Sequence, residues 1–240
     1  MEKEAILRAL REGTLDLQGQ LVNSSNHTFL TRLSDKGREL AVVYKPVRGE
    51  RPLWDFPVGT LAKREVAAYL VSEALGWDLV PATVFRVKAP LGPGSVQLYI
   101  DHDPNYHYFR FDEKDRQRLR PVAIFDALVN NADRKGGHIL LDVANDRLFL
   151  IDHGICFNAQ DKLRTVVWDF AGKQAPPELL ADVQRFSLAL EQKEEIYRQL
   201  LKFLSLEEIT ALVSRAARLL ETGCFPRPDP AHRPYPWPPI

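Results

Sequence analysis

The sequence has no excess of charge of either sign. Lys and Arg together number 32, and Asp and Glu also number 32, so the formal net charge of the 240-residue chain is zero. Dedicated nucleic-acid binders usually carry a basic excess, because much of their affinity comes from phosphate contacts. We therefore expect no nucleic-acid partner, although a local basic patch remains compatible with this composition.

Cysteines and long apolar runs are also scarce. Cys156 and Cys224 form no CxxC pair, which makes a disulfide framework or a structural zinc site improbable. No stretch approaches the roughly 18 consecutive apolar residues of a membrane helix. The first residues, MEKEAILR, lack the apolar run of a signal peptide. We expect a cytoplasmic protein without a transmembrane segment.

A standard glycine-rich phosphate loop is missing as well, because neither GxGxxG nor GxxxxGK[ST] occurs. A polar cluster at 23–28 instead lies between two apolar runs that predict a strand pair. Ser24, Ser25 and Asn26 at this hairpin tip could present backbone N–H groups to an anion. On these residues alone, an ordinary polar turn is the favoured interpretation.

The first half of the chain predicts a small antiparallel sheet with one helix against it. A β-branched run at 40–45 predicts a strand that ends in Lys45-Pro46. Thr60 as N-cap and Gly76 as stop predict a helix over 61–75, with Glu65 at the edge of its apolar stripe. Further segments predict a short helix at 2–10 and strands at 82–87 and 95–100.

The second half is predicted to be mostly helical. A helix starting near Pro121 runs into the stretch NNADRKGGH at 130–138, and two apolar runs then predict a hairpin. Ser205 and Glu208 form a capping box for the last helix. The tail from 226 onward holds seven of the 17 prolines and either packs across the domain or hangs free. The expected segments are the hairpin strands 139–143 and 147–151 and helices at 178–190, 192–204 and 206–221.

The polar residues at the ends of these elements indicate a phosphate and metal site. Because the hairpin connects two polar clusters, Asp133, His138 and Asp152 are expected to meet at one rim. Phosphoryl transfer needs cations on the phosphates, acids that hold those cations, and a group that accepts the nucleophile's proton. Lys45 would supply a fixed cation, and Glu65 the carboxylate that holds it.

This ordered set resembles the phosphoinositide 3/4-kinase and HipA-type branch of the protein-kinase-like fold. Asp133-Arg134-Lys135-Gly136-Gly137-His138 matches the catalytic loop Asp-Arg-His-x-x-Asn, and Asp152-His153-Gly154 matches the metal motif Asp-Phe-Gly. With Tyr44-Lys45-Pro46 and Trp54-Asp55-Phe56-Pro57, the motifs resemble more closely an uncharacterised actinobacterial-type family grouped with those kinases. The resemblance covers roughly residues 13–220.

The resemblance implies a role for each matched residue. Asp133 would be the catalytic base, with Lys135 as a cation near the transferred phosphate, and Asp152 would ligate the metal. Lys45 would contact the α and β phosphates, positioned by Glu65. By order along the chain alone, phosphate cover is assigned to Ser24, Ser25 and Asn26, and the adenine hinge to Gln97–Ile100, including Tyr99.

His138 stands where the family has asparagine. Magnesium prefers oxygen ligands whereas imidazole suits manganese or zinc, so either the metal differs or His138 binds it differently. The expected cofactors are ATP with Mg²⁺ or Mn²⁺, and the acceptor, protein or small molecule, is left open.

The resemblance implies an α+β, bilobal kinase-like fold. Residues 1–100 would form the N-lobe, 101–225 the C-lobe and 226–240 a Pro-rich tail. The expected function is transfer of the ATP γ-phosphate to a hydroxyl acceptor. Three alternatives stay open: protein adenylyl transfer, a catalytically inactive nucleotide-binding module, and a metal-dependent hydrolase using Asp133, His138 and Asp152 directly.

Overall fold

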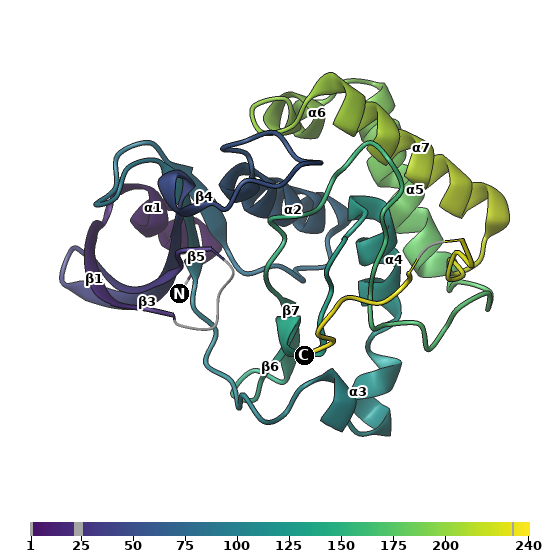
Figure 1. Cartoon of the computed structure of the whole chain (residues 1–240), viewed down its shortest axis with the longest axis horizontal. Coiled ribbons are helices and arrows are strands. Elements are labelled where there is room, and N and C mark those ends of the chain that lie inside the picture. Colours follow the sequence, from purple (N-terminus) through teal and green to yellow (C-terminus); the bar gives the residue numbers. More distant parts are fainter. Residues whose placement is uncertain (1, 22–25, 232) are drawn as a thin grey trace.

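The computed structural model describes residues 2–21, 26–231 and 233–240. A β-rich lobe lies at one side, a helical lobe at the other, and a two-stranded hairpin lies between them (Figure 1). This arrangement confirms the predicted α+β, bilobal fold with an antiparallel sheet in the first lobe and mostly helices in the second.

The five-stranded sheet has the order β1-β2-β3-β5-β4, and all its neighbouring strands are antiparallel. Its central strand β3 alternates buried Val42 and Tyr44 with partly exposed Val43 and Lys45, as expected for a strand with one face on the core. The strands are β1 Thr14–Gln20, β2 Phe29–Asp35, β3 Arg38–Pro46, β4 Thr83–Arg86 and β5 Gly94–Leu98.

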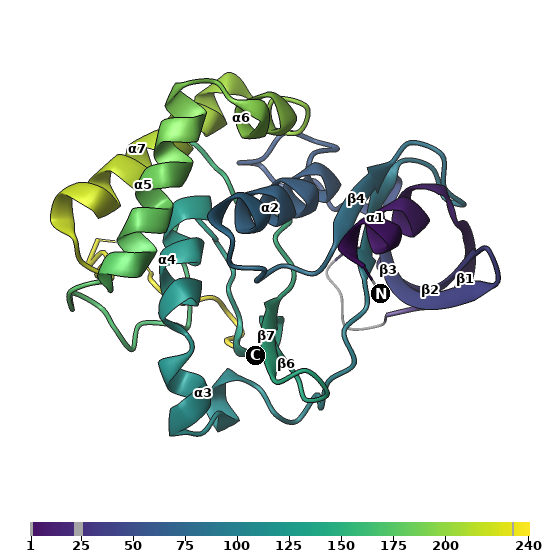
Figure 2. The same ribbon diagram turned by 180° about the vertical axis from the view of Figure 1, so that it is seen from behind.

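Two helices cover this sheet: α1 (Lys3–Glu12) and α2 (Leu61–Leu75) both contact β4 and β5 (Figure 2). Gly76 ends α2 in the left-handed conformation, as predicted. Thr60 is the N-cap residue of α2, as predicted, but its side chain accepts no hydrogen bond from the helix and its hydroxyl donates to the Pro57 carbonyl at 2.7 Å. The Glu50 carboxylate accepts from the N–H groups of Leu61 (3.1 Å) and Ala62 (2.8 Å), because a full negative charge suits the positive end of the helix dipole.

A buried arginine ties α2 to the helical lobe. Arg64 is 1% exposed, and its guanidinium pairs with Glu208 and donates to the Cys156 carbonyl at 2.6 Å. Glu208 also accepts from the Ser205 N–H at 2.8 Å, which confirms the predicted capping box at the start of α7. One carboxylate therefore joins the two lobes and caps a helix.

The helical lobe follows the predicted order with one shortened element. The expected helix 192–204 is reduced to α6, because Lys193 takes a left-handed φ of 53° that separates α6 from α5. The charged segment 112–120 contains the short α3. The elements are η1 Val47–Gly49, η2 Tyr108–Arg110, α3 Glu113–Gln117, α4 Arg120–Val129, η3 Gly136–His138, β6 Ile139–Asp142, β7 Arg147–Leu150, α5 Pro177–Glu191, α6 Glu195–Leu200 and α7 Leu206–Thr222.

The proline-rich tail packs across the helical lobe instead of hanging free. The Pro234 carbonyl accepts from the Thr165 N–H at 3.0 Å, and the Pro239 carbonyl accepts from the Gly136 N–H at 2.8 Å. The chain end therefore lies beside the 130–138 stretch and the β6–β7 hairpin, as both views show (Figures 1 and 2). Among the described residues, no helix combines the length and apolarity that crossing a bilayer requires.

Candidate functional site

Lys45 places a cation on the sheet at the boundary between the lobes. Its Nζ pairs with Glu65 Oε1 and lies 3.0 Å from Asp152 Oδ1, and its side chain is 20% exposed. Burial opposes the charged form of Lys45, but the Asp152 and Glu65 carboxylates outweigh burial and raise its pKa above the ordinary value. Lys45 is therefore a fixed ammonium group held by two acids.

Glu65 is buried on α2, and its interactions reach both lobes. While one carboxylate oxygen pairs with Lys45, Oε2 accepts from the His153 N–H at 3.0 Å. The commoner fate of a helix glutamate, local pairing at the surface, does not apply here, because Glu65 is 2% exposed. Gly154 follows His153 at a place where an added Cβ would lie 3.7 Å from Glu65 Oε1.

Asp152 follows β7 and has a positive φ of 62°, so the chain turns sharply at this carboxylate. Lys45 holds the pKa of Asp152 far below the usual range, burial opposes that shift, and His138 adds to it. His138 Nε2 lies 3.3 Å from Asp152 Oδ2. Asp152 is therefore ionised between two nitrogen groups and keeps a half-exposed face.

His138 is a neutral imidazole at physiological pH. Burial lowers its pKa to about 4, although Asp152 acts in the opposite direction. The Lys135 N–H donates to His138 Nδ1 at 3.4 Å, so the ring carries its proton on Nε2, the atom that faces Asp152. In this tautomer the N–H of Nε2 lies on the side of the Asp152 carboxylate, with 3.3 Å between Nε2 and Oδ2.

Asp133 is held by its own loop. Its N–H donates to Asn131 Oδ1 at 2.9 Å, and its Oδ2 lies 3.7 Å from Lys135 Nζ. Burial raises the pKa of Asp133 to about 6; Lys135 opposes that rise, and the neighbouring charge of Asp152 adds to it. Asp133 is thus an ionised acid at neutral pH that is more basic than an ordinary aspartate.

Beneath this rim lies a buried ionic network that the sequence analysis did not predict. Arg134 and Asp126 are fully buried, with Arg134 Nε 3.0 Å from Asp126 Oδ1. Arg134 also donates to the Ile151 carbonyl at 2.8 Å, and its Nη2 lies 2.8 Å from His153 Nε2. Thr165 Oγ1 donates to Asp126 Oδ2 at 3.0 Å, and Arg134 Nε lies 3.2 Å from the same oxygen. The available signal was an aspartate within an otherwise apolar helical segment, at 122–129.

The network holds both acid-bearing loops at once. Through Arg134 it contacts the carbonyl that precedes Asp152, and Asn131 Nδ2 donates to Asp126 Oδ1 at 3.2 Å while Asn131 Oδ1 accepts from the Asp133 N–H. Its members therefore position the site through the backbone without facing the cleft.

The phosphate-cover and hinge assignments have less support in the contacts. Asn26 Oδ1 accepts from the Arg51 N–H at 2.8 Å, and Ser24 and Ser25 lie outside the described residues. The Gln97 amide donates to Thr83 Oγ1 at 2.8 Å within the sheet. The Tyr99 N–H donates to the Ala41 carbonyl at 3.0 Å, where β5 passes into the connection to the second lobe. These remain predictions.

The donor set suits a metal that is carried by phosphate oxygens. The described residues contain no group of three or more His, Cys, Asp or Glu side chains placed to hold a metal ion. Magnesium commonly uses one or two protein carboxylates and takes its other ligands from water and substrate phosphates. Asp152, with its half-exposed carboxylate, fits that role.

No family model matches the chain. Solved structures with a similar fold include proteins named as kinases. The Golgi casein kinase with Mn/ADP bound aligns with a TM-score of 0.62 at 14% identity, over 99% of this chain and 80% of that one. A hydra Fam20 structure with sugar aligns with a TM-score of 0.61 at 14% identity, over 91% of this chain and 87% of that one. The Helicobacter pylori proinflammatory kinase CtkA aligns with a TM-score of 0.54 at 11% identity, over 89% of this chain and 95% of that one. The chain has a kinase-like fold.

Relatives by sequence include a plant enzyme and a bacterial protein. Phosphatidylinositol 4-kinase gamma 4 of Arabidopsis thaliana is 28% identical over 172 residues, which cover 61% of this chain and 30% of that protein. Protein Rv2133c of Mycobacterium tuberculosis is 40% identical over an alignment 264 positions long, which covers 95% of this chain and 93% of that protein. At this identity over nearly both whole chains, this protein belongs to the family of Rv2133c.

Proposed function

We propose that the protein is an ATP-dependent phosphotransferase, an atypical kinase that moves the γ-phosphate to a hydroxyl acceptor. The observation that carries the proposal is the contact of Lys45 with both Glu65 and Asp152. A lysine held by a helix glutamate, next to an acid at the end of a hairpin, is the arrangement by which kinases position phosphates and metal. Chance burial of one lysine between two acids would not also place Asp133 at the same rim.

In this proposal Lys45 contacts the α and β phosphates of the nucleotide, and Glu65 fixes the direction of its ammonium group. Asp152 would hold Mg²⁺ or Mn²⁺, which when bound neutralises charge on the β and γ phosphates. Direct metal binding by His138 stays a prediction, and the bond from the Lys135 N–H to Nδ1 favours a different role. His138 would position Asp152 through the 3.3 Å contact between Nε2 and Oδ2.

Asp133 would accept the proton of the acceptor hydroxyl. As that oxygen bonds to the γ-phosphorus, the bond from γ-phosphorus to the bridging oxygen breaks, and ADP leaves with the bond's electrons. The pKa of about 6 leaves Asp133 mostly ionised at pH 7 yet basic enough to take a proton. The Lys135 ammonium, 3.7 Å from Asp133, would stabilise charge on the transferred group.

The branch of the kinase-like fold is also part of the proposal. The Asp-Arg-x-x-x-His loop, the Asp-His-Gly motif and the partial match to plant phosphatidylinositol 4-kinases support the phosphoinositide 3/4-kinase and HipA-type branch. The acceptor can be a protein or a small molecule. The plant enzyme matches 61% of this chain at 28% identity, and this partial similarity does not identify the acceptor.

The decisive experiment follows labelled phosphate from ATP in the presence of Mg²⁺ or Mn²⁺. We expect the wild type to release ADP and label from the γ position, and Asp152→Asn to lower this turnover at least about 100-fold with the fold intact. A matched control is Asp16→Asn, because Asp16 is also paired with a basic side chain, Arg32 at 2.9 Å, but lies on the edge strand β1. Equal turnover in Asp152→Asn and the control would overturn the assignment.

Two other outcomes would replace the proposal. Label from the α-phosphate on the product would establish adenylyl transfer instead. Stabilisation by ATP and metal without any turnover would establish a nucleotide-binding module.

A further inference from the structure

A cavity lined by polar and apolar side chains lies beside Asn130, at the start of the 130–138 stretch. It has a volume of about 810 Å³, which is within the usual range for small-molecule sites. Asn130 reaches its wall, whereas Lys45, Glu65, Asp133 and Asp152 do not line it. The cavity is therefore separate from the proposed nucleotide site. Its walls come from the segment 160–172, helix α7 and the tail.

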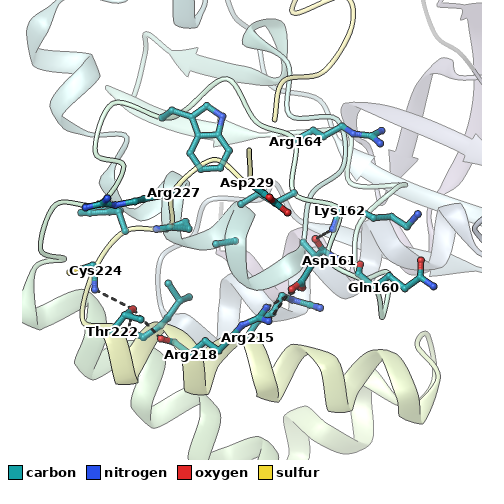
Figure 3. Close-up of a pocket in the computed structure, with 18 of the residues that line it drawn as sticks. Gln160, Asp161, Lys162, Arg164, Arg215, Arg218, Thr222, Cys224, Arg227 and Asp229 are labelled. Atoms are coloured by element: carbon teal, nitrogen blue, oxygen red, sulfur yellow. Dashed lines mark hydrogen bonds and ion pairs between the residues drawn. The ribbon is translucent and has the colours of Figure 1, made fainter. Parts of the chain in front are cut away.

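Positive charge predominates in this cavity. Its described lining has two carboxylates, Asp161 and Asp229, against six cationic side chains: Lys162, Arg164, Arg215, Arg218, Arg227 and Arg233. Figure 3 shows Arg215 and Arg218 rising from α7 beside Asp161, with Arg227 of the tail on another wall. The zero net charge of the chain conceals this local excess.

The carboxylates present do not balance these cations. Asp161 pairs with Arg218 at 2.9 Å, and Lys162 pairs at 3.0 Å with Asp55, outside the cavity lining. Within the described part of the chain, three further lining arginines form no ion pair within 4.0 Å; these are Arg164, Arg227 and Arg233. Arg164 also acts electrostatically on Asp133, and Arg233 lies over the Trp237 ring at 5.1 Å. The excess of cationic over acidic side chains around the cavity still favours an anionic ligand.

Arg215 provides an independent observation. It is 4% exposed, and its Nε donates to the Leu128 carbonyl at 2.8 Å while Nη1 donates to the Asn158 carbonyl at 3.3 Å. Its buried Nη2 has no hydrogen-bond partner among the described residues. A buried, unpaired guanidinium nitrogen is costly. Because Arg215 also lines the cavity, a small shift of its side chain would let this nitrogen donate to an anion bound there. Burial lowers the pKa of Arg215 to about 10, so it stays charged at neutral pH.

Apolar side chains complete the lining and indicate an organic ligand. Trp168, Leu219 and Phe225 line the same cavity as the arginines. A phosphate group would match the planar fork of arginine, and the body of the ligand would pack on these side chains.

We propose that this cavity is a binding site for a small phosphorylated molecule, recognised by Arg215, Arg218 and Arg227. The site goes beyond the proposed kinase function and does not depend on it. One wall of the cavity also contacts the 130–138 stretch, because the Arg164 N–H donates to the Asn131 carbonyl at 2.8 Å.

The test uses two polyanion probes, inorganic pyrophosphate and tripolyphosphate, and follows thermal stability of the full chain. At concentrations about 100-fold above the dissociation constant, we expect a rise in melting temperature of about 5 °C in the wild type. The double variant Arg218→Gln, Arg227→Gln should weaken binding at least about tenfold. The control Arg198→Gln removes an exposed arginine of α6, paired with Glu195, and should bind like the wild type.

A substitution in the proposed nucleotide site distinguishes binding there from binding in the basic cavity. Lys45→Met should lose stabilisation by ATP and keep stabilisation by pyrophosphate, whereas the double arginine variant should do the reverse. If pyrophosphate stabilises the double arginine variant but not Lys45→Met, the probes bind the nucleotide cleft and the proposal is wrong. The absence of stabilisation of the wild type by either probe would also overturn it. Failure of the kinase assay would leave this result unaffected.

Discussion

Arg134 and Arg215 are both buried arginines of the helical lobe, and their surroundings are opposite. Arg134 has Asp126 as a counter-ion and further partners in the Ile151 carbonyl and His153. Arg215 has carbonyl partners, no carboxylate within 4.0 Å among the described residues, and an unpaired Nη2. A satisfied buried charge indicates a structural support, whereas an unsatisfied one beside a cavity indicates a place for a ligand.

The largest effect on stability is expected from substitution of Arg134. Arg134→Met leaves the Asp126 carboxylate buried without its cation, and we expect the free energy of unfolding to fall by about 3–5 kcal/mol. Urea denaturation at constant pH measures this change.

A second substitution separates charge from packing. Adding Asp126→Leu to Arg134→Met removes both charges and should recover much of the lost stability. If the single variant were as stable as the wild type, the network around Arg134 would not be the support described above.

Substitution of Asp133, whose loop is held by this network, should affect turnover and not stability. Asp133→Asn should reduce turnover about 100-fold or more, because the proton acceptor is lost, without reducing stability. Turnover and urea denaturation on the same preparation test this pair of outcomes. Loss of stability equal to that of Arg134→Met would place Asp133 in the network instead of at the reacting rim.

The raised pKa of Asp133 predicts a pH dependence for both properties. As the pH falls below about 6, Asp133 becomes protonated, and turnover should fall about tenfold per pH unit. Because the folded chain holds this proton more tightly than the unfolded chain, the contribution of Asp133 to stability is lost as pH rises from about 4 to about 6. Asp133→Asn should therefore gain stability relative to the wild type above pH 6, measured by urea denaturation at pH 4 and pH 8.

The smallest effect is expected at the unsatisfied arginine. Arg215→Met removes hydrogen bonds to Leu128 and Asn158 and also a costly unpaired nitrogen, so stability should change by about 1 kcal/mol or less. Calorimetry measures the shift. A loss as large as that of Arg134→Met would remove the distinction between the two arginines.

Local patterns were enough to predict much of the fold and the rim. Strand ends and a hairpin predicted that Asp133, His138 and Asp152 meet, and the structure does bring them to one rim. The capping box of Ser205 and Glu208 was predicted because it depends on residues three apart. Contacts that rest on such local patterns can be inferred from sequence.

Contacts between distant segments could not be predicted in this way. The pairs Arg64 with Glu208 and Lys45 with Asp152 join residues more than 100 positions apart, and only the second had a family motif to indicate it. The cap of α2 by Glu50 was missed because its carboxylate comes from a loop before the usual capping position. The basic cavity was missed because its cations come from three separate segments of a chain with no net charge.

The contact of Arg64 with Glu208 has a consequence for regulation. Many kinases switch by moving the helix that carries the glutamate partner of the strand lysine. Here that helix is α2, and moving it away would separate a buried ion pair and release the Cys156 carbonyl. At a cost of about 3–5 kcal/mol, fewer than about one molecule in a hundred would have the helix displaced at any moment. The contact of Arg64 with Glu208 and the Cys156 carbonyl therefore fixes the position of α2 against the helical lobe.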